Sequence, residues 1–312
     1  MLAQCLESLQ GQTEKHHIIV VENGSTDGSV ELVKGKFPAV ILLEFPDNAG
    51  FAGGVNRGIK HALEQGAEYI ALFNNDAVAD KNWLKELVAE AGEHPQAGII
   101  TGKLLRTDKK HLDSTGDFYT IWGLPFPRGR NQKDEGQYDK AEDVFGGSGG
   151  ASLYRAGLFK QIGLFDEDFF AYYEDVDISF RAQMAGWQVR YTPEAIAYHG
   201  VGGTSSKLGD FARYHSAKNF LLLYARNMPL KLYLKYGIPF ALQFGRMAMT
   251  SIARRKFGVF LSGTFAAFKL HFTTVKVRKA NQQKRKVSVD YIDSILTHSR
   301  PPRITAAVDD NH

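Results

Sequence analysis

The sequence predicts an α/β fold followed by a helical, basic appendage, and three observations lead to this prediction. Short apolar runs alternate with amphipathic, helix-like segments through the first hundred residues. Polar residues gather directly after several of these runs. Residues 211–289 contain 16 Lys and Arg and no Asp or Glu, whereas residues 1–210 contain 20 Lys and Arg and 30 Asp and Glu. An acidic body is therefore joined to a strongly basic C-terminal region.

The bulk composition is that of an ordinary globular protein. The chain has 312 residues, of which 44% are hydrophobic and 23% are charged, enough for one large domain with an appendage or for two domains. Its one cysteine, Cys5, excludes the class of folds held by internal disulfides.

Strand-like and helix-like segments follow each other in a regular order. We expect strands at 17–22, 39–45, 69–73 and 97–105, with helices between them. This alternation indicates a mostly parallel sheet, in which ligands bind at the carboxyl ends of the strands. Beyond a polar excursion at 107–143 we expect two short strands, 188–192 and 195–199, and mainly helices from about residue 211.

Two polar clusters, one of them strongly acidic, could carry chemistry. Asn74, Asn75 and Asp76 follow the strand 69–73, and Asp76 is a hard oxygen ligand suited to Mg²⁺ or Mn²⁺. The alternative is a set of N-capping residues for the helix that follows. The run "EDVD" at 174–177 follows an aromatic loop, where a partly desolvated carboxylate can act as a base. The alternative is ordinary enrichment of acids in a first helical turn.

Two glycine-rich segments and one histidine are further candidates. "GFAGGVNRG" (50–58) and "FGGSGGAS" (145–152) allow the backbone to approach a phosphate or a sugar, although tight turns explain them equally well. His199 ends a short strand and, taken alone, is an ordinary hydrogen-bonded histidine.

The order of these motifs carries more information than any one of them. The series "VVENGSTDGS", "DNAGFAGGVNRGI", "LFNNDAV", "GGASLYRAGLFKQIGLFDEDFFAYYEDVDISFRAQMAGW" and "AYHGVGG" resembles the inverting family 2 glycosyltransferases, and most of all their rhamnosyltransferase-like branch, over about residues 2–228. The resemblance implies a GT-A fold, with a Rossmann-like mixed sheet and flanking helices, over residues 1–210. It also implies a nucleotide-sugar half at about 1–105 and an acceptor half at about 106–210, and leaves 211–312 as a helical, basic, membrane-associating region and tail.

The resemblance also implies roles for individual residues. It makes Asp175 the catalytic base, with Glu174 beside it, and assigns Asp76 and His199 to a Mn²⁺ or Mg²⁺ site. Contacts to the nucleotide sugar are expected from Glu22, Asn23, Ser25, Asn48, Gly53, Asn56, Asn74 and Asn75. Contacts to the acceptor or the sugar are expected from Gly149, Gly150, Tyr172 and Tyr173.

The expected function is transfer of a deoxysugar such as rhamnose, with inversion, in bacterial polysaccharide biosynthesis. The donor would be a dTDP- or UDP-sugar, and the acceptor a polysaccharide or a lipid-linked oligosaccharide. Two departures from the family pattern leave an alternative open, a catalytically inactive nucleotide-sugar-binding or membrane-scaffold protein. Asp76 is the only carboxylate of its motif, where a second Asp is common, and Glu22 stands where Asp is frequent.

The basic appendage suggests an anionic partner. Its apolar segments are shorter than the roughly 18–20 residues that span a bilayer, so helices lying on an anionic membrane surface fit better. We expect a cytoplasmic protein, peripheral on the inner face of the plasma membrane. Nucleic acid is the competing partner, but no nucleic-acid motif is present and none is expected to bind. A solvated basic face that binds nothing specific is the remaining alternative.

The start of the resemblance gives one more expectation. "LAQCLESLQGQT" corresponds to the family's first helix, which in that family follows a central strand. We therefore expect the first strand of the sheet to be missing. Strands 17–22 and 68–73 should then stand about two strand spacings apart, roughly 9–10 Å, without pairing.

Overall fold

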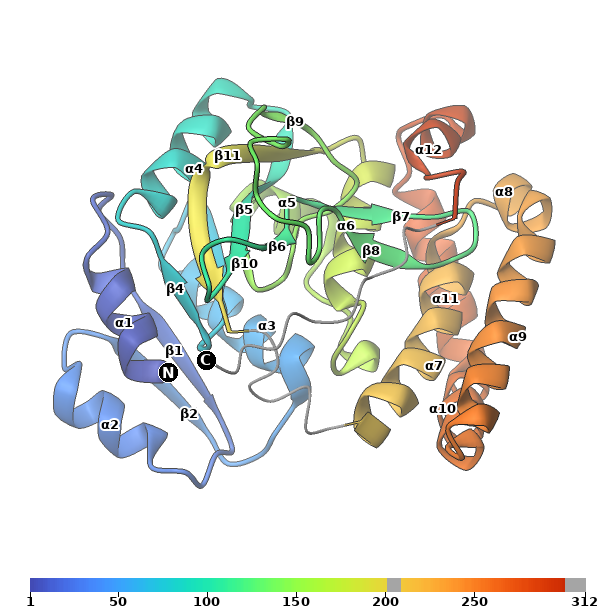
Figure 1. The fold of residues 1–312 in the computed structure, drawn as a ribbon, viewed down its shortest axis with the longest axis horizontal. Coiled ribbons are helices and arrows are strands. Elements are labelled where there is room, and N and C mark those ends of the chain that lie inside the picture. The colour runs from blue at the N-terminus through green and yellow to red at the C-terminus, as the bar shows by residue number, and fades with distance from the viewer. Residues whose placement is uncertain (201–208, 301–312) are drawn as a thin grey trace.

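The structure, a computed structural model, describes residues 1–200 and 209–300 and centres on a mixed seven-stranded sheet flanked by helices (Figure 1). Along the sheet, the strands lie in the order β3 (Tyr69–Phe73), β10 (Ala151–Arg155), β5 (Ala97–Arg106), β11 (Gln188–His199) and β4 (Ala77–Ala79). The short strands β6 (Leu112–Ser114) and β9 (Glu142–Asp143) pair with β5 and β11.

The directions of the strands correct one expectation and confirm another. Strand β10 is antiparallel to both β3 and β5, β11 is parallel to β5, and β4 is antiparallel to β11. The expectation of a mostly parallel sheet is therefore wrong, and the mixed sheet implied by the family resemblance is confirmed. The cause is β10, which follows the long excursion and inserts between two strands that come earlier in the chain.

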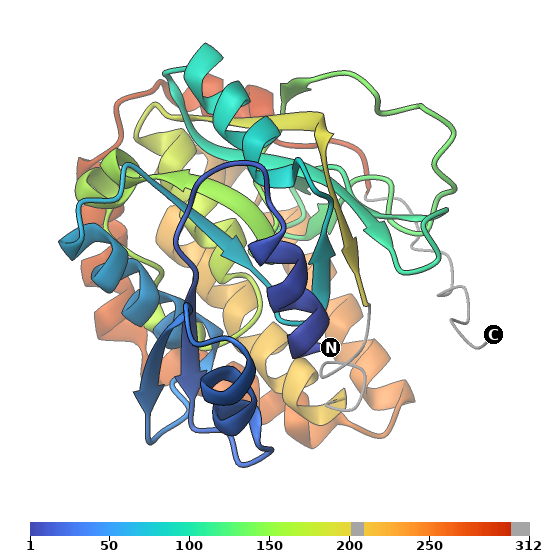
Figure 2. The ribbon, with the colours of Figure 1, turned by 90° about the vertical axis from the view of Figure 1, so that its left-hand side faces the viewer.

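The first two strands form a sheet of their own. Strand β1 (Ile19–Asn23) pairs in parallel with β2 (Ile41–Phe45), and Figure 2 shows this pair in dark blue. Helices α1 (Leu2–Gln10), α2 (Ser29–Lys36) and α3 (Gly50–Glu64) belong to the same part of the chain. Strands β1 and β3 lie in different sheets and do not pair with each other.

The two short strands expected at 188–192 and 195–199 are one strand, and the prediction of two is wrong. Strand β11 runs from Gln188 to His199 and pairs with β5 on both sides of an irregularity between Thr192 and Ile196. Pro193, which lacks an N–H group, lies in this irregularity. A Cβ atom on Gly102 of β5 would lie 2.0 Å from the carbonyl oxygen of Ala195, so the bulge fits only against a glycine.

Helices and a hairpin complete the body of the protein. Strand β5 is buried along its whole length, including its polar residues Thr101, Lys103 and Arg106. The remaining elements up to residue 200 are α4 (Trp83–Glu93), α5 (Ala156–Ile162), the 3₁₀ turn η1 (Glu167–Phe169), α6 (Glu174–Met184) and the hairpin of β7 (Asp117–Tyr119) with β8 (Pro125–Pro127).

The C-terminal region is helical, as expected, and packs on the body. It consists of α7 (Gly209–Asn227), α8 (Leu230–Lys235), α9 (Gly237–Ala253), α10 (Phe257–Lys269), α11 (His271–Gln283) and α12 (Val289–Ile295), the orange and red part of Figure 1. One hydrophobic cluster joins Phe145 and Phe180 of the body to Leu223 and Ile292, so the regions on either side of residue 210 share a core. None of the helices in the described ranges is both long and apolar enough to cross a bilayer.

Candidate active site

The Asn74–Asp76 cluster lies in a turn between β3 and β4 at one end of the sheet. Helix α4 begins only at Trp83, and its N-cap residue is Asn82, so the N-capping interpretation of the cluster is wrong. The turn is closed by the N–H of Ala77, which donates to the carbonyl oxygen of Asn74 (3.1 Å). Asn75 is exposed, whereas Asn74 and Asp76 are half-buried.

The glycine turn at 149–150 connects this cluster to the predicted base. Gly150 accepts a hydrogen bond from the N–H of Asn74 (2.8 Å), and a Cβ atom on Gly150 would lie 2.8 Å from the Asn74 amide nitrogen. The N–H of Gly149 donates to Oδ2 of Asp175 (3.1 Å). Asn74 and Asp175, which lie about 100 residues apart in the sequence, are thus bonded to neighbouring residues of one turn.

Asp175 stands in the first turn of α6 with both carboxylate oxygens oriented. Oδ1 accepts from the N–H of Val176 (2.8 Å) and Oδ2 from Gly149. Burial raises the pKa of Asp175, while these N–H donors act in the opposite direction. Burial and the charge of Asp175 raise the pKa of the neighbouring Glu174 to about 8, and Glu174 Oε2 has no hydrogen-bond partner among the described residues. The charge of Asp175 thus favours the protonated form of Glu174.

His199 lies between two carboxylates. Its Nδ1 is 2.9 Å from Oδ2 of Asp113, and its Nε2 is 3.2 Å from Oδ1 of Asp76. Burial lowers the pKa of His199, but the hydrogen bonds and charges of the two aspartates outweigh it and raise the pKa to about 9. The "GVGG" run that follows His199 extends beyond the described residues.

The residues at this point fit a divalent cation. Oδ1 of Asp76 is buried and faces Nε2 of His199 (3.2 Å), and it has no other hydrogen-bond partner among the described residues. A histidine whose second nitrogen is held by a carboxylate is a common metal ligand, and the carboxylate of Asp76 suits Mn²⁺ or Mg²⁺. Asp76 and His199 would thus supply one oxygen and one nitrogen donor, with Asp113 orienting the histidine.

Three further charged residues of this site come from the polar excursion and were not predicted. Nη2 of Arg130 lies 2.9 Å from Oδ1 of Asp113. Asp117 accepts a hydrogen bond from the hydroxyl of Ser114 (3.1 Å), and burial together with the charge of Asp175 raises the pKa of Asp117 to about 7. The hydrogen bond from His199 and the positive charge of Arg130 outweigh burial and lower the pKa of Asp113. The charge of Arg130 also opposes, without cancelling, the rise in the pKa values of Asp117 and Asp175. No local sequence pattern distinguishes these residues from other polar loop residues.

Several of the residues predicted to contact the nucleotide sugar gather where β1 meets α3, whereas Asn74 and Asn75 lie in the turn between β3 and β4. The carboxylate of Glu22 accepts from the N–H groups of Gly24 (3.2 Å) and Ser25 (2.5 Å), which lowers its pKa and orders the turn after β1. The amide of Asn23 donates to the carbonyl of Gly50 (2.9 Å) and to Oδ1 of Asn48 (3.2 Å). The end of β1 is therefore tied to the start of α3.

Two other predicted residues lie inside helix α3. A Cβ atom on Gly53 would lie 2.6 Å from Cβ of Ala49, so this turn of the helix accepts no side chain without movement. Asn56 is 2% exposed. Its side-chain NH₂ donates to the carbonyl oxygen of Phe165 (2.9 Å) and to Oε1 of Glu167 (2.9 Å), and its Oδ1 accepts from the N–H of Phe165 (3.0 Å). Asn56 thus anchors the acidic and aromatic loop that leads to Asp175.

That loop has an unusual backbone. Phe170, Tyr172 and Tyr173, three of the four residues before α6, have φ angles of 65°, 69° and 72°, in the left-handed region that aromatic residues rarely adopt. Tyr173 is also deeply packed, and burial raises the pKa of its hydroxyl to about 12. A conformation of this kind persists only where its surroundings enforce it.

Helix α7 provides much of that enforcement. The side-chain amide of Asn219, fully buried, donates to the carbonyl oxygens of Phe169 (2.9 Å), Ala171 (2.8 Å) and Tyr172 (2.7 Å). Arg226, also fully buried, pairs with Asp168 (2.7 Å) and with Asp166. The basic C-terminal region therefore shapes the predicted catalytic loop, a role that its composition did not reveal.

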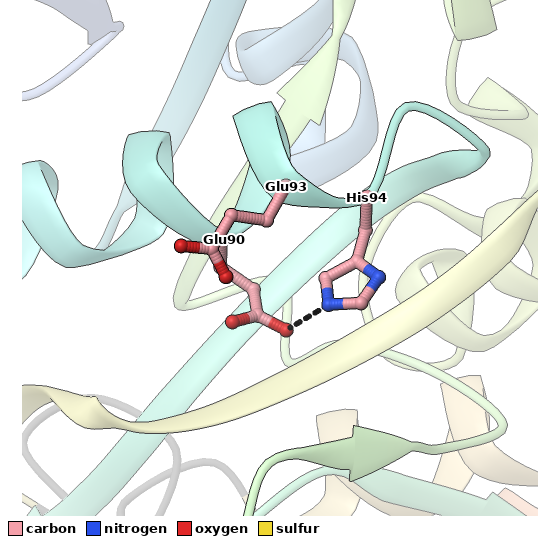
Figure 3. Close-up of side chains that lie close together, drawn as sticks. All are labelled: Glu90, Glu93 and His94. Atoms are coloured by element: carbon pink, nitrogen blue, oxygen red, sulfur yellow. Dashed lines mark ion pairs between the residues drawn. The ribbon is translucent and has the colours of Figure 1, made fainter.

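A second group of potential metal ligands lies at the end of α4, apart from the Asp76 and His199 site. Glu90, Glu93 and His94 come together at the end of α4 (Figure 3). Oε1 of Glu90 lies 3.3 Å from Nε2 of His94 and also accepts from Nε of Arg190 (2.8 Å). Since Arg190 already neutralises Glu90 and Glu93 is exposed, this group is explained as a surface ion-pair network.

Comparison with known proteins supports the family resemblance. The model for "Glycosyl transferase family 2" matches residues 1–163. An N-acetylglucosaminyl-diphospho-decaprenol L-rhamnosyltransferase of Mycobacterium tuberculosis is 27% identical over 248 residues, covering 72% of this chain and 80% of the relative. The dTDP-rhamnosyl transferase RfbF of Shigella flexneri is 27% identical over 231 residues, covering 70% of this chain and 75% of that relative.

Solved structures show the same fold. A mannosyltransferase from Pyrobaculum calidifontis, in complex with GDP-Man and Mn²⁺, superposes with a TM-score of 0.52 at 15% identity over 91% of this chain and 81% of that one. Residues 1–349 of TarS from S. aureus give a TM-score of 0.52 at 14% identity over 94% and 87%. The mixed sheet and its flanking helices are thus a GT-A fold, and the chain belongs to glycosyl transferase family 2.

Proposed function

We propose that this chain transfers a deoxysugar such as rhamnose from a nucleotide-diphosphate donor to a glycan or lipid-linked acceptor, with inversion at the anomeric carbon. The observation that carries the proposal is the glycine turn that bonds Asn74 through Gly150 and Asp175 through Gly149. It keeps a candidate base close to the candidate cation and diphosphate site. The two rhamnosyltransferase relatives support the choice of sugar.

Asp175 acts as the base in this proposal. The acceptor hydroxyl gives its proton to the Asp175 carboxylate while its oxygen forms a bond to the anomeric carbon from the face opposite the diphosphate. The bond from that carbon to the diphosphate oxygen breaks, and the nucleoside diphosphate leaves with the electron pair. The N–H groups of Gly149 and Val176 orient the carboxylate, and the raised pKa of Asp175 strengthens it as a base.

Asp76 and His199 hold the cation in this proposal, with Asp113 orienting the histidine. When bound, the cation supplies charge neutralisation for the diphosphate leaving group. The Mn²⁺ complex of the mannosyltransferase with the same fold supports a divalent cation in this proposal.

The function is tested by donor binding and donor turnover in the purified chain. With Mn²⁺ present, dTDP at a hundred times its Kd should stabilise the protein by about 2.7 kcal/mol. dTDP-rhamnose should release dTDP, and EDTA should abolish the release. Turnover by Asp76→Asn should no longer be stimulated by Mn²⁺. Glu93→Gln, which removes a carboxylate from the Glu90, Glu93 and His94 group at the end of α4, should leave the stimulation by Mn²⁺ unchanged. Binding without any turnover would favour the inactive nucleotide-sugar-binding alternative, and no binding of nucleoside diphosphates or their sugars would refute the proposal.

We also propose that the C-terminal helices lie on an anionic membrane surface. An exposed apolar stripe runs along α10 and α11 at helical spacing, made of Phe257, Leu261, Phe265, Phe268, Phe272 and Val275, with exposed fractions from 37% to 80%. The same region carries basic residues without any acid between 211 and 289. Apolar side chains that enter the headgroup region beside basic side chains are typical of interfacial helices.

Phe272→Asp is expected to weaken this membrane association. Phe272 is 80% exposed, and loss of its burial in the interface costs about 1.5–3 kcal/mol, so partitioning onto phosphatidylglycerol vesicles should fall by at least about tenfold. Val78→Asp adds the same charge at an exposed apolar residue of β4 and should change partitioning little. Sedimentation with vesicles measures both variants. Equal binding by the two variants, or no binding by the unaltered chain, would contradict the proposal.

A further inference from the structure

An open aromatic cleft lies between the predicted catalytic loop and the C-terminal helices. Its volume is about 560 Å³, and its walls include Phe170, Phe211, Tyr214, His215, Lys218 and Lys269. The Phe170 ring stacks on His215 with centroids 5.2 Å apart, and the Tyr172 ring lies 6.2 Å from Phe211. The cleft therefore begins at the loop that leads into Asp175.

A second cleft, of about 450 Å³, continues the first towards the exposed apolar stripe. It is lined by Leu261 and Phe265 of that stripe, and it shares Tyr214, Ala266 and Lys269 with the first cleft. Helix α10 is fixed against α7 here, because a Cβ atom on Gly263 would lie 2.2 Å from the carbonyl oxygen of Tyr214. The two clefts form one groove, which we call the α7–α10 groove.

The charge available in this groove is positive. Lys269 is exposed at the junction of the two clefts, and no carboxylate of the described residues pairs with it. Two acids line the first cleft, but Asp168 is paired with Arg226 (2.7 Å), and Glu167 accepts from Asn56 (2.9 Å). Lys218 donates to the carbonyl oxygens of Asp168 and Phe169. Lys269 is thus the cation left to meet an anionic ligand.

We propose that the α7–α10 groove binds the lipid diphosphate portion of a lipid-linked acceptor. Leu261 and Phe265 contact the first units of the apolar chain, where the groove opens onto the membrane-facing stripe. Lys269 contacts the diphosphate, and the aromatic wall at Phe170 contacts the sugar as it extends towards Asp175. This inference rests on the proposed transfer to a lipid-linked acceptor and assigns residues to that acceptor's non-sugar part.

The order of features along the groove favours this occupant over a second copy of the chain. The groove has an apolar end at the exposed apolar stripe, Lys269 in the middle and an aromatic end near the base, which match an apolar chain, a diphosphate and a sugar in that order. Lys269 Nζ lies over the Phe265 ring, 5.8 Å from its centroid, and has no carboxylate partner among the described residues. A protein partner would need no such sequence of chemistries.

The probe is farnesyl diphosphate, a soluble isoprenoid diphosphate, titrated into the full chain by calorimetry with dTDP and Mn²⁺ at saturation. We expect one site, and we expect Lys269→Glu to weaken its Kd by about tenfold or more. Lys276→Glu makes the same charge change at an exposed α11 residue outside the groove and should stay within about twofold. Ala266→Trp, which fills the junction of the clefts, should abolish the binding of farnesyl diphosphate. The melting temperature of this variant shows whether it is folded.

The outcomes separate this inference from the proposed function. Equal Kd values for Lys269→Glu and Lys276→Glu, or equally tight binding of inorganic diphosphate without the apolar chain, would overturn the groove assignment even if donor turnover is normal. Weaker binding of farnesyl diphosphate by Lys269→Glu, but not by Lys276→Glu, would support the groove assignment even if no donor turnover is found. A self-associating chain that Ala266→Trp makes monomeric, with no farnesyl diphosphate bound, would assign the groove to a second copy and refute the inference.

Discussion

Asp175→Asn is expected to lower turnover by about 10²–10⁴-fold while the fold and donor binding are retained. Asparagine has nearly the same shape as aspartate, and its one amide oxygen can accept from one of the two N–H groups of Gly149 and Val176. The other N–H loses its acceptor, so we expect a modest loss of stability with α6 and the glycine turn kept in place. It cannot take a proton from an attacking hydroxyl. The loss should therefore appear in kcat rather than in the Kd of the donor.

Two controls make this result specific. Asp290→Asn removes a carboxylate that is 84% exposed and remote from the site, and it should leave turnover unchanged. Glu174→Gln should be far milder than Asp175→Asn near pH 7, because the pKa of Glu174 is raised to about 8 and a neutral amide resembles its protonated form. A severe loss of turnover in Glu174→Gln, together with near-normal turnover in Asp175→Asn, would make Glu174 rather than Asp175 the base.

The same assignment fixes the sign of the pH dependence. A base must be unprotonated, so kcat/KM should fall as the pH is lowered through the pKa of Asp175. Burial raises that pKa, and the acid limb should therefore lie at higher pH than for an exposed aspartate. Asp175→Asn should remove this limb from the residual activity, and a limb that persists unchanged would contradict the assignment.

Local patterns predicted most of the individual elements. Strand β3 has the predicted bounds, Tyr69–Phe73, because an apolar run between polar turns needs no information from elsewhere in the chain. The two polar clusters were found from the sequence because each concentrates unusual side chains within three or four residues. The roles given to them came from the family resemblance rather than from spacing.

What the sequence could not reveal depends on contacts between distant residues. The antiparallel insertion of β10 depends on pairing with strands that lie about 50 and 80 residues earlier, and nothing within "ASLYR" indicates direction. Arg130 and Asp117 join the site because a polar excursion folds back over it. Asn219 looks like a surface residue in a basic helix, yet it is fully buried against the catalytic loop.

Asn219→Leu is the variant that should show how far the predicted base depends on helix α7. Leucine has a similar size but no N–H donor, so the carbonyl oxygens of Phe169, Ala171 and Tyr172 lose their shared partner. Each residue held at positive φ stores about 1–3 kcal/mol of backbone strain, and without the amide the loop should relax. Since this loop leads directly into α6, Asp175 should shift, and a misplacement of about 1 Å can cost about 10²-fold in rate.

Loss of stability alone would also lower activity, so the comparison needs a second buried asparagine. Asn281 is 8% exposed, and its side-chain amide donates to Oδ1 of Asn227 (3.0 Å) and, more weakly, to the carbonyl oxygen of Arg226 (3.5 Å), rather than to carbonyl groups of the catalytic loop. Asn281→Leu should lower the melting temperature by a similar amount and leave kcat nearly unchanged below that temperature. Asn219→Leu should lower kcat by about 10²-fold with little change in the donor KM. If the two variants lose kcat equally, Asn219 stabilises the fold without positioning the base. If only Asn219→Leu loses kcat, the basic C-terminal region is part of the catalytic apparatus, because the buried amide of Asn219 fixes the backbone of the loop that leads into Asp175.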